Sequence, residues 1–302
     1  MSLLYALESL RVPFLNYFFL GITYLGMEAL SFVVFFIYYW CINKMGGYFI
    51  LANCLIGTGI NQTFKMVFRI PRPFVRDPDF TIVEEARPTT GGFSFPSGHT
   101  QNATSLYGSI AVIRNQSLIR ILCAIMIVLV AFSRLYLGAH HPSDVLGGFA
   151  IGIAVLIAMT FVFRRIWNHP NMLPALFGVT GGIMVVAGLL FESGLAGGGA
   201  DPEVMADSLK AYYISAGCIL AAAVCEPIER KYISFDTKAV WWAQILKAAI
   251  GMGLTGALIL LMKYPADALF GGLGIRYTFW FFVPTAFGIC IWPMSFRWFA
   301  SR

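Results

Sequence analysis

Long runs of apolar residues, separated by polar segments, dominate the chain. A helix needs about 20 mostly apolar residues to cross a bilayer, and the 302-residue sequence contains nine runs that approach or exceed this length. The runs cover residues 16–41, 46–68, 99–113, 119–138, 143–164, 172–191, 208–225, 240–262 and 277–296, of which the third and seventh are short. None alternates apolar and polar residues as the strands of a membrane barrel do. The pattern therefore predicts an all-α, polytopic transmembrane helical bundle of about nine spans.

The segments outside these runs differ in character. The first ten residues place Leu3, Leu4, Leu7 and Leu10 at helical spacing and lack a basic start, so we expect an interfacial helix that Pro13 ends, and no cleavable signal peptide. Residues 69–98 form a long polar loop, and a structureless loop of this length is usually functional. Residues 193–207 are rich in glycine but lack the spacing and the lysine of a phosphate-binding loop.

We accordingly divide the chain into three parts. Residues 1–45 hold the interfacial helix and the first span, residues 46–170 hold a catalytic core, and residues 171–302 supply four additional transmembrane helices. Nine spans place the two termini on opposite sides of the membrane. The loops on the side of the C-terminus are rich in basic residues such as Arg164 and Arg165, so the positive-inside rule makes that side cytoplasmic. The loop 69–98 is then extracytoplasmic.

Composition agrees with a membrane protein and excludes other classes. Hydrophobic residues make up 58% of the chain and charged residues only 12%, which is about half the charged share of a soluble domain. The net charge of +6 contains no basic run long enough to bind nucleic acid. The six cysteines form no CxxC pair and no cluster with zinc spacing. We therefore expect no metal, no cofactor, no nucleic-acid partner and no disulfide framework.

Three polar clusters interrupt the apolar pattern, all on the predicted extracytoplasmic side. The first is Lys65 followed by Arg72 and Pro73, the second is Pro96-Ser97-Gly98-His99, and the third is Ser133-Arg134 followed by His140 and Asp144. Lys65, Arg72 and Arg134 supply three cations, which suit the oxygens of a phosphate. Ser97 and Gly98 stand where a helix begins, so that backbone N–H groups and the helix dipole also favour an anion.

The two histidines suit phosphoryl transfer through a covalent intermediate. His140 lies in a short loop and Asp144 follows four residues later, where its carboxylate can orient one ring nitrogen and leave the other as a nucleophile. His99 is then the proton donor to the leaving oxygen. These assignments make His140, His99 and Asp144 the candidate catalytic residues.

The combined pattern resembles the three-part signature of the type 2 phosphatidic acid phosphatase superfamily, over about residues 46–165. The resemblance implies that Lys65, Arg72, Ser97, Gly98 and Arg134 bind phosphate. It also implies that His99 is the acid, that His140 forms the phosphoenzyme, that Asp144 orients it, and that no metal is needed. Only two predicted spans precede the first motif, and four follow the core, which leaves the subfamily and a homodimer open.

Several of these residues also admit a less specific interpretation. The three cations could be interfacial side chains that reach for the headgroups, but their convergence with both histidines favours a site. His141 has no role in the signature. Glu28 lies inside the first span, where an ionisable residue indicates function by default, although pairing with Asn61 or Gln62 would make it structural.

The sequence predicts an integral membrane phosphatase that hydrolyses a lipid phosphate or lipid pyrophosphate. A vanadate-dependent peroxidase and a catalytically silent transporter or lipid-binding protein remain as alternatives. Phosphatidic acid, its lyso form, phosphatidylglycerophosphate, a sphingoid phosphate and a polyprenyl pyrophosphate all fit as substrates.

Overall fold

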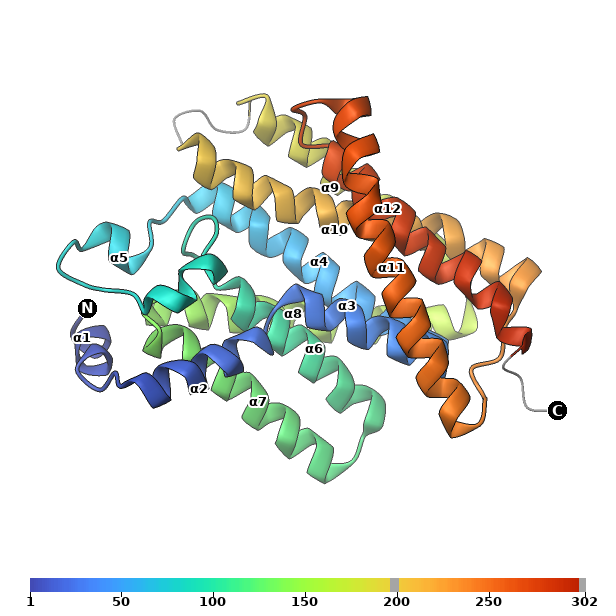
Figure 1. Ribbon diagram of the computed structural model, residues 1–302, viewed down its shortest axis with the longest axis horizontal. Coiled ribbons are helices and arrows are strands. Elements are labelled where there is room, and N and C mark those ends of the chain that lie inside the picture. The colour runs from blue at the N-terminus through green and yellow to red at the C-terminus, as the bar shows by residue number, and fades with distance from the viewer. Residues whose placement is uncertain (196–200, 299–302) are drawn as a thin grey trace. The chain divides into compact units, whose positions relative to one another are not determined.

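The computed structural model describes residues 1–195 and 201–298 and consists of helices joined by loops (Figure 1). Every element in this described part is helical, in agreement with the predicted class. The chain divides into two compact units. Unit 1 comprises residues 1–31, 57–158 and 197–208, and unit 2 comprises residues 32–56, 159–196 and 209–302. The predicted three-part division stays a prediction, and part of the glycine-rich segment, residues 196–200, lies outside the described residues.

Unit 1 contains the N-terminal helices and the middle of the chain. Its elements are α1 (Ser2–Glu8), α2 (Pro13–Tyr24), the start of α3 (Glu28–Ile37), the second half of α4 (Lys44–Phe68), α5 (Pro73–Arg76), the short helix η2 (Glu84–Thr89), α6 (Gly98–Arg114), α7 (Ser117–Tyr136) and most of α8 (Pro142–Asn168). Helix α7 packs against α1, α2 and α6, and Figure 1 shows α2 running beside α7.

Unit 2 contains the remaining helices. Its elements are the rest of α3, η1 (Tyr38–Ile42), the first half of α4, the end of α8, α9 (Met172–Glu192), most of α10 (Pro202–Ile228), η3 (Glu229–Ile233), α11 (Trp241–Phe270), α12 (Arg276–Ala286), η4 (Phe287–Ile291) and η5 (Trp292–Trp298). Helices α11 and α12 pack together. Side chains of η1 bond the backbone of η4, since Tyr39 donates to the Ile289 carbonyl and Trp40 to that of Gly288.

The predicted count of nine spans is not confirmed. In the described part of the chain, six helical segments are long and apolar enough to cross a membrane: α7, α8, α9, α10 continued by η3, α11, and the run Arg276–Trp298. The first predicted span is broken into α2 and α3, which meet at a 49° bend and raise the number to seven if they form one span. The runs 46–68 and 99–113 do form helices, but α6 has only 17 residues and buries a polar face.

The bend between α2 and α3 is held by side chains of α6. Asn102 donates to the Gly26 carbonyl at 3.0 Å, and Tyr107 donates to the Leu25 carbonyl at the same distance. Gly26 lies so close to α6 that a Cβ there would stand 3.1 Å from the His99 carbonyl oxygen and closer still to Val130. Only glycine allows this approach, and the bend is therefore fixed next to one of the predicted site histidines.

The polar loop 69–98, expected to be structureless, is ordered by α1 and by two short helices of its own, α5 and η2. Arg11 donates to the backbone carbonyls of Thr81 and Tyr136, and Glu8 accepts from the backbone N–H of Thr81. Val83 and Ala86 of the loop pack against Tyr136 and Leu137 in a small apolar cluster. Glu8 of α1 and Arg11, which follows this helix, thus fasten the loop onto the end of α7. The N-terminal helix was expected to end at Pro13, but α1 ends at Glu8 and Pro13 is the first residue of α2.

Close packing of α6 against α8 brings the second and third motifs together. A Cβ on Gly148 would clash with the backbone carbonyl of Ser97, and one on Gly152 would lie 2.6 Å from Thr104. Two glycines four residues apart allow helices to approach closely. The N–H of Ser97 also donates to the backbone carbonyl of Asp144 at 2.8 Å. The start of α6 is therefore joined directly to the first turn of α8.

Candidate active site

The eight residues singled out from the sequence all lie in unit 1. They come from the end of α4, the residue before α5, the start of α6, the end of α7, and the start of α8 with the loop before it. The charged members are buried, since Lys65 and Arg72 are each 5% exposed and Arg134 is fully buried. Burial of three cations beside a single buried carboxylate, Asp144, is costly unless an anion joins them. The cluster is therefore suited to an anionic ligand.

Arg72 immediately precedes α5 and holds three backbone carbonyls. Its guanidinium donates to Gly91 at 2.6 Å, to Gly92 at 3.1 Å and to Ala139 at 3.0 Å. The same nitrogen that bonds Ala139 lies 3.3 Å from Nε2 of His140. Because these bonds fix the planar guanidinium, Arg72 ties the long loop to the loop that carries His140.

His140 is buried between Arg72 on one ring nitrogen and Asp144 on the other. Its Nδ1 lies 3.5 Å from Oδ2 of Asp144 and 3.5 Å from Oγ of Ser94. An arginine N–H can only donate, so the contact of Arg72 with Nε2 favours the tautomer with the proton on Nδ1. The arrangement leaves the Nε2 lone pair facing the cations.

Asp144 is positioned by several bonds besides its contact with His140. Its Oδ2 accepts from the hydroxyl of Ser94 at 2.6 Å and from the backbone N–H of His141 at 2.8 Å, and its Oδ1 accepts from Ser143 at 3.3 Å. As the carboxylate stands in the first turn of α8, the helix dipole also stabilises its charge.

The electrostatics of the loop residues follow from burial. Burial lowers the pKa of His140 well below its ordinary value, and the charges of Arg72, Arg134 and Lys65 lower it further. Burial lowers the pKa of Arg72 to about 10, while Asp144 and Asp207 oppose the shift. At neutral pH the imidazole of His140 is therefore uncharged and nucleophilic, and the guanidinium of Arg72 remains a cation.

The start of α6 differs from the expected arrangement in one respect. Ser97 is the N-cap residue, and its hydroxyl accepts from the backbone N–H and the hydroxyl of Thr100 at 3.4 and 3.0 Å. Its own N–H donates to the backbone carbonyl of Asp144, so this N–H is paired within the protein and is not free for a ligand. A Cβ at Gly98 would contact only Asn61, at 3.7 Å, which leaves space beside the helix start.

His99 and Arg134 contribute unpaired nitrogens. Nε2 of His99 and Nε of Arg134 are buried without a hydrogen-bond partner. The remaining nitrogens of Arg134 are held by Thr23 at 2.6 Å and by the side chain and carbonyl of Thr89 at 3.0 and 3.3 Å. Unpaired buried donors are rare in proteins and indicate a place for a ligand.

Four polar residues around the cluster were not predicted as part of the site, although Asn61 was considered as a partner of Glu28. Ser94 bonds Asp144, Thr23 and Thr89 bond Arg134, and Asn61 is fully buried with both side-chain polar atoms unpaired. None of the four belongs to a motif, and no periodic signal marks them. Among the described residues, no group of three His, Cys, Asp or Glu side chains could hold a metal ion.

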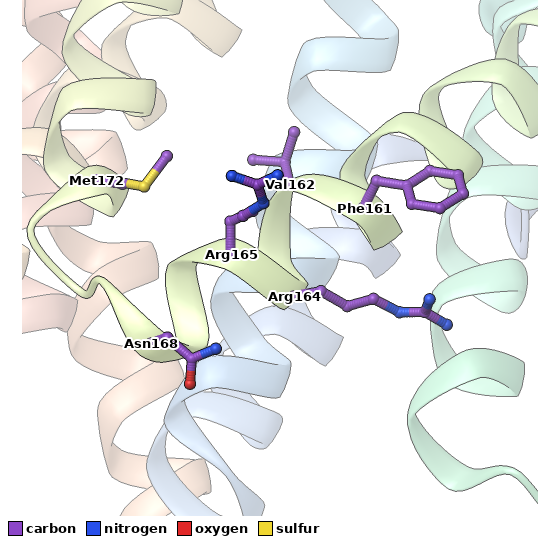
Figure 2. A pocket seen from close by; sticks show the side chains of 6 residues that line it. All are labelled: Phe161, Val162, Arg164, Arg165, Asn168 and Met172. Atoms are coloured by element: carbon purple, nitrogen blue, oxygen red, sulfur yellow. The ribbon is translucent and has the colours of Figure 1, made fainter.

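A hollow of about 540 Å³ lies elsewhere, in unit 2, at the end of α8 and the start of α9. Figure 2 shows its lining, in which the side chains of Arg164 and Arg165 extend in different directions and Met172 projects from the next helix. None of the eight predicted site residues lines it. It has no histidine or carboxylate that could carry out the predicted chemistry.

Comparison with known proteins identifies the family. The profile of the PAP2 superfamily matches residues 42–168. A phosphatidylglycerophosphatase B of Bacillus subtilis is 34% identical over 163 residues, which cover 48% of this chain and 73% of the relative. The chain belongs to the PAP2 superfamily. The resemblance stated from the three motifs is thereby confirmed.

Two other relatives match shorter parts of their own length. A probable sphingosine-1-phosphate phosphatase of Dictyostelium discoideum is 28% identical and matches 65% of this chain and 50% of its own. Undecaprenyl-diphosphatase BcrC of Bacillus subtilis is 35% identical, matching 37% of this chain and 52% of its own. The chain thus spans about half the length of these two relatives.

A crystal structure of a transmembrane PAP2-type phosphatidylglycerolphosphate phosphatase from Bacillus subtilis is 28% identical. It covers 55% of this chain and 84% of its own, with a TM-score of 0.45. From the family and the apolar helices, this PAP2 protein is a phosphate ester hydrolase and a multi-pass membrane protein.

Proposed function

We propose that the chain hydrolyses a membrane lipid phosphate through a phosphohistidine formed on His140. The observation that carries the proposal is the buried His140, whose Nδ1 faces Asp144 and whose Nε2 faces Arg72. The relatives named as acting on phosphatidylglycerophosphate and on undecaprenyl diphosphate support a lipid substrate. The apolar helices of the chain also suit a substrate that stays in the bilayer.

The reaction proceeds in two displacements at phosphorus. Lys65, Arg72 and Arg134 bind the non-bridging oxygens and stabilise the charge that develops on them. Nε2 of His140 attacks phosphorus while the P–O bond to the lipid breaks, and His99 gives its proton to the departing oxygen. Water then attacks the phosphohistidine, His99 takes a proton from it, and phosphate leaves with His140 restored.

The contact between His140 and Asp144 is long, but catalytic hydrogen bonds tighten when substrate binds. Asp144 holds the tautomer and stabilises the positive charge that the imidazole gains on phosphorylation. Ser94 fixes the orientation of Asp144 through the short bond to Oδ2. Gly98 allows a phosphate oxygen to approach the start of α6.

A phosphate-release assay on the purified protein in detergent tests this function. The panel comprises phosphatidic acid, its lyso form, phosphatidylglycerophosphate, a sphingoid phosphate and a polyprenyl pyrophosphate, each with and without EDTA. Because the site supplies its own cations, release should persist in EDTA, and vanadate should inhibit by mimicking the five-coordinate phosphorus. Loss of release in EDTA with recovery in magnesium contradicts the mechanism. Release from no lipid favours the silent binding protein, and vanadate-dependent halide oxidation favours the peroxidase.

We further propose that the site opens on the extracytoplasmic side. Basic residues gather in the loops on the opposite side, including Arg164 and Arg165 at the end of α8. Asp79 and Asn168 are both exposed and lie on the two proposed sides.

Cysteine labelling of intact cells tests this orientation. A cysteine in place of Asp79 should react with an impermeant thiol reagent, and one in place of Asn168 should react only after the cells are opened. The native cysteines give a low background, because five are buried and Cys41 is half-buried. The reverse pattern of labelling would place the site in the cytoplasm.

A further inference from the structure

Three polar side chains on one face of α4 connect the site with a carboxylate on α3 that the mechanism does not use. Thr58, Asn61 and Lys65 occupy positions three and four residues apart, so they share one face of α4. Glu28, the first residue of α3, meets this face, since the Thr58 hydroxyl donates to its Oε1 at 3.5 Å and its charge interacts with that of Lys65. All four residues belong to unit 1.

The carboxylate of Glu28 is held in place next to α6, the helix that carries His99. The bend that precedes α3 is fixed by the bond from Asn102 to the Gly26 carbonyl, and Ser31 donates to the side chain of Asn102 at 3.0 Å. Glu28 lies between these two anchors in the sequence. Glu28 as a whole residue is exposed, whereas Asn61 and Lys65 are buried. The polar face of α4 therefore connects a carboxylate at the edge of the protein with the buried cations.

Asn61 is the second observation that points to a ligand. It is fully buried, and neither its Nδ2 nor its Oδ1 has a hydrogen-bond partner. Its Oδ1 faces the open side of Gly98, where the phosphate is proposed to bind. An unpaired buried amide is unfavourable, and a polar group of the substrate next to the phosphate would satisfy it. Asn61 and Lys65 are four positions apart on α4, which is about 6 Å along the helix.

We propose that Glu28 and Asn61 form a subsite for a cationic or hydroxyl-bearing group beside the phosphate, and that the substrate is a lipid monophosphate with a protonated amine a few bonds from the ester oxygen. Sphingoid base phosphates have this chemistry. The carboxylate attracts an ammonium group and repels a second phosphate, so it disfavours a pyrophosphate. The amide accepts from an ammonium or hydroxyl group and donates to an ester oxygen. This inference rests on the proposed function of the site.

The test compares three substrates that differ near the phosphate. They are sphingosine phosphate, its N-acetyl derivative, which keeps the chain but loses the charge, and phosphatidic acid. Wild-type protein in detergent should show a kcat/KM for the free amine that exceeds that for the N-acetyl lipid by about 10–100-fold, the range of a hydrogen bond to a charged group. The preference should decline at alkaline pH as the amine loses its proton.

Glu28→Gln separates recognition from a structural role. It should lower kcat/KM for the amine-bearing lipid by about tenfold or more and leave phosphatidic acid within about twofold, so that the preference is lost. Asn61→Leu should weaken the same preference. The matched control is Glu203→Gln, an exposed carboxylate at the start of α10, which should change no substrate.

Each remaining outcome overturns one claim. Equal losses on all three lipids in Glu28→Gln would show that Glu28 only positions Lys65, and would overturn the subsite. A wild-type protein that releases phosphate from the three lipids at equal rates would overturn it as well, while leaving the proposed phosphatase function intact. Release from none of them, under conditions where the protein is folded, would contradict the proposed function itself.

Discussion

Replacing His140 with alanine should abolish turnover of every phosphate ester, because the proposed covalent intermediate forms on its Nε2. Loss of a covalent nucleophile costs on the order of 10⁶-fold in kcat in a serine hydrolase. The three cations remain in the variant, so the substrate should still bind. The measurement is phosphate release together with the binding of a radiolabelled lipid phosphate to the same preparation.

His141→Ala is the matched control for this variant. His141 neighbours the proposed nucleophile and is half-buried, but its contact with Asp144 is made by the backbone N–H, which alanine keeps. Its activity should therefore stay near that of the wild type. Asp144→Asn should lie between the two and lower kcat on all substrates alike, because an amide sets the wrong tautomer of His140. Substantial turnover by His140→Ala would remove the phosphohistidine from the mechanism.

Replacing His99 should have an effect that depends on the leaving group. A lipid alkoxide is a poor leaving group and needs a proton, while an aryl oxide such as p-nitrophenolate leaves with little help. General acid catalysis contributes about 10²–10⁴-fold. His99→Ala should lose about that factor on a lipid phosphate and much less on p-nitrophenyl phosphate. The unpaired, buried Nε2 of His99 is the atom that would carry the proton.

The measurement is kcat on both esters, at a pH where wild-type rates are not limited by binding. His140→Ala serves as the comparison, since it should lose both activities equally. Equal losses for His99→Ala on the two esters would count against its role as an acid and in favour of phosphate binding alone.

The charged residues of the candidate site stand out in the sequence, whereas the residues that hold them in place do not. Lys65, Arg72, Arg134 and both histidines stand out because charged and titratable residues are rare in apolar runs and their spacing forms a signature. The supports bond across long stretches of chain. The residue that holds Arg134, for example, is Thr23, 111 positions earlier. A lone threonine at the end of an apolar helix carries no pattern that predicts such a contact.

The helical class could be predicted from the apolar runs, whereas the number of spans could not. Apolar runs of about 20 residues mark helices of a membrane protein, and each predicted run does contain helix in the structure. Whether a helix spans depends on what its faces meet. Helix α6 buries polar residues such as Gln101 and Asn102 against its neighbours, so its low hydropathy reflects contacts inside the protein.

For the loop 69–98, the sequence predicted less structure than the loop has. Its polar composition predicted a structureless connection, yet Arg11 and Glu8 of the N-terminal segment hold it against α7. Ordering of this loop fixes Arg72, whose three carbonyl partners include Gly91 and Gly92 within the loop itself. Contacts of this kind join segments that are far apart in the sequence, and local periodicity does not encode them.

Trapping of the covalent intermediate tests the central claim most directly. Wild-type protein is mixed with a lipid carrying a radiolabelled phosphate, quenched in alkali within one turnover and digested for mass spectrometry. The account predicts an acid-labile, alkali-stable phosphate on the peptide that contains His140, and none in His140→Ala. A wild-type protein that releases phosphate without ever carrying the label, or a label that persists in His140→Ala, would contradict it.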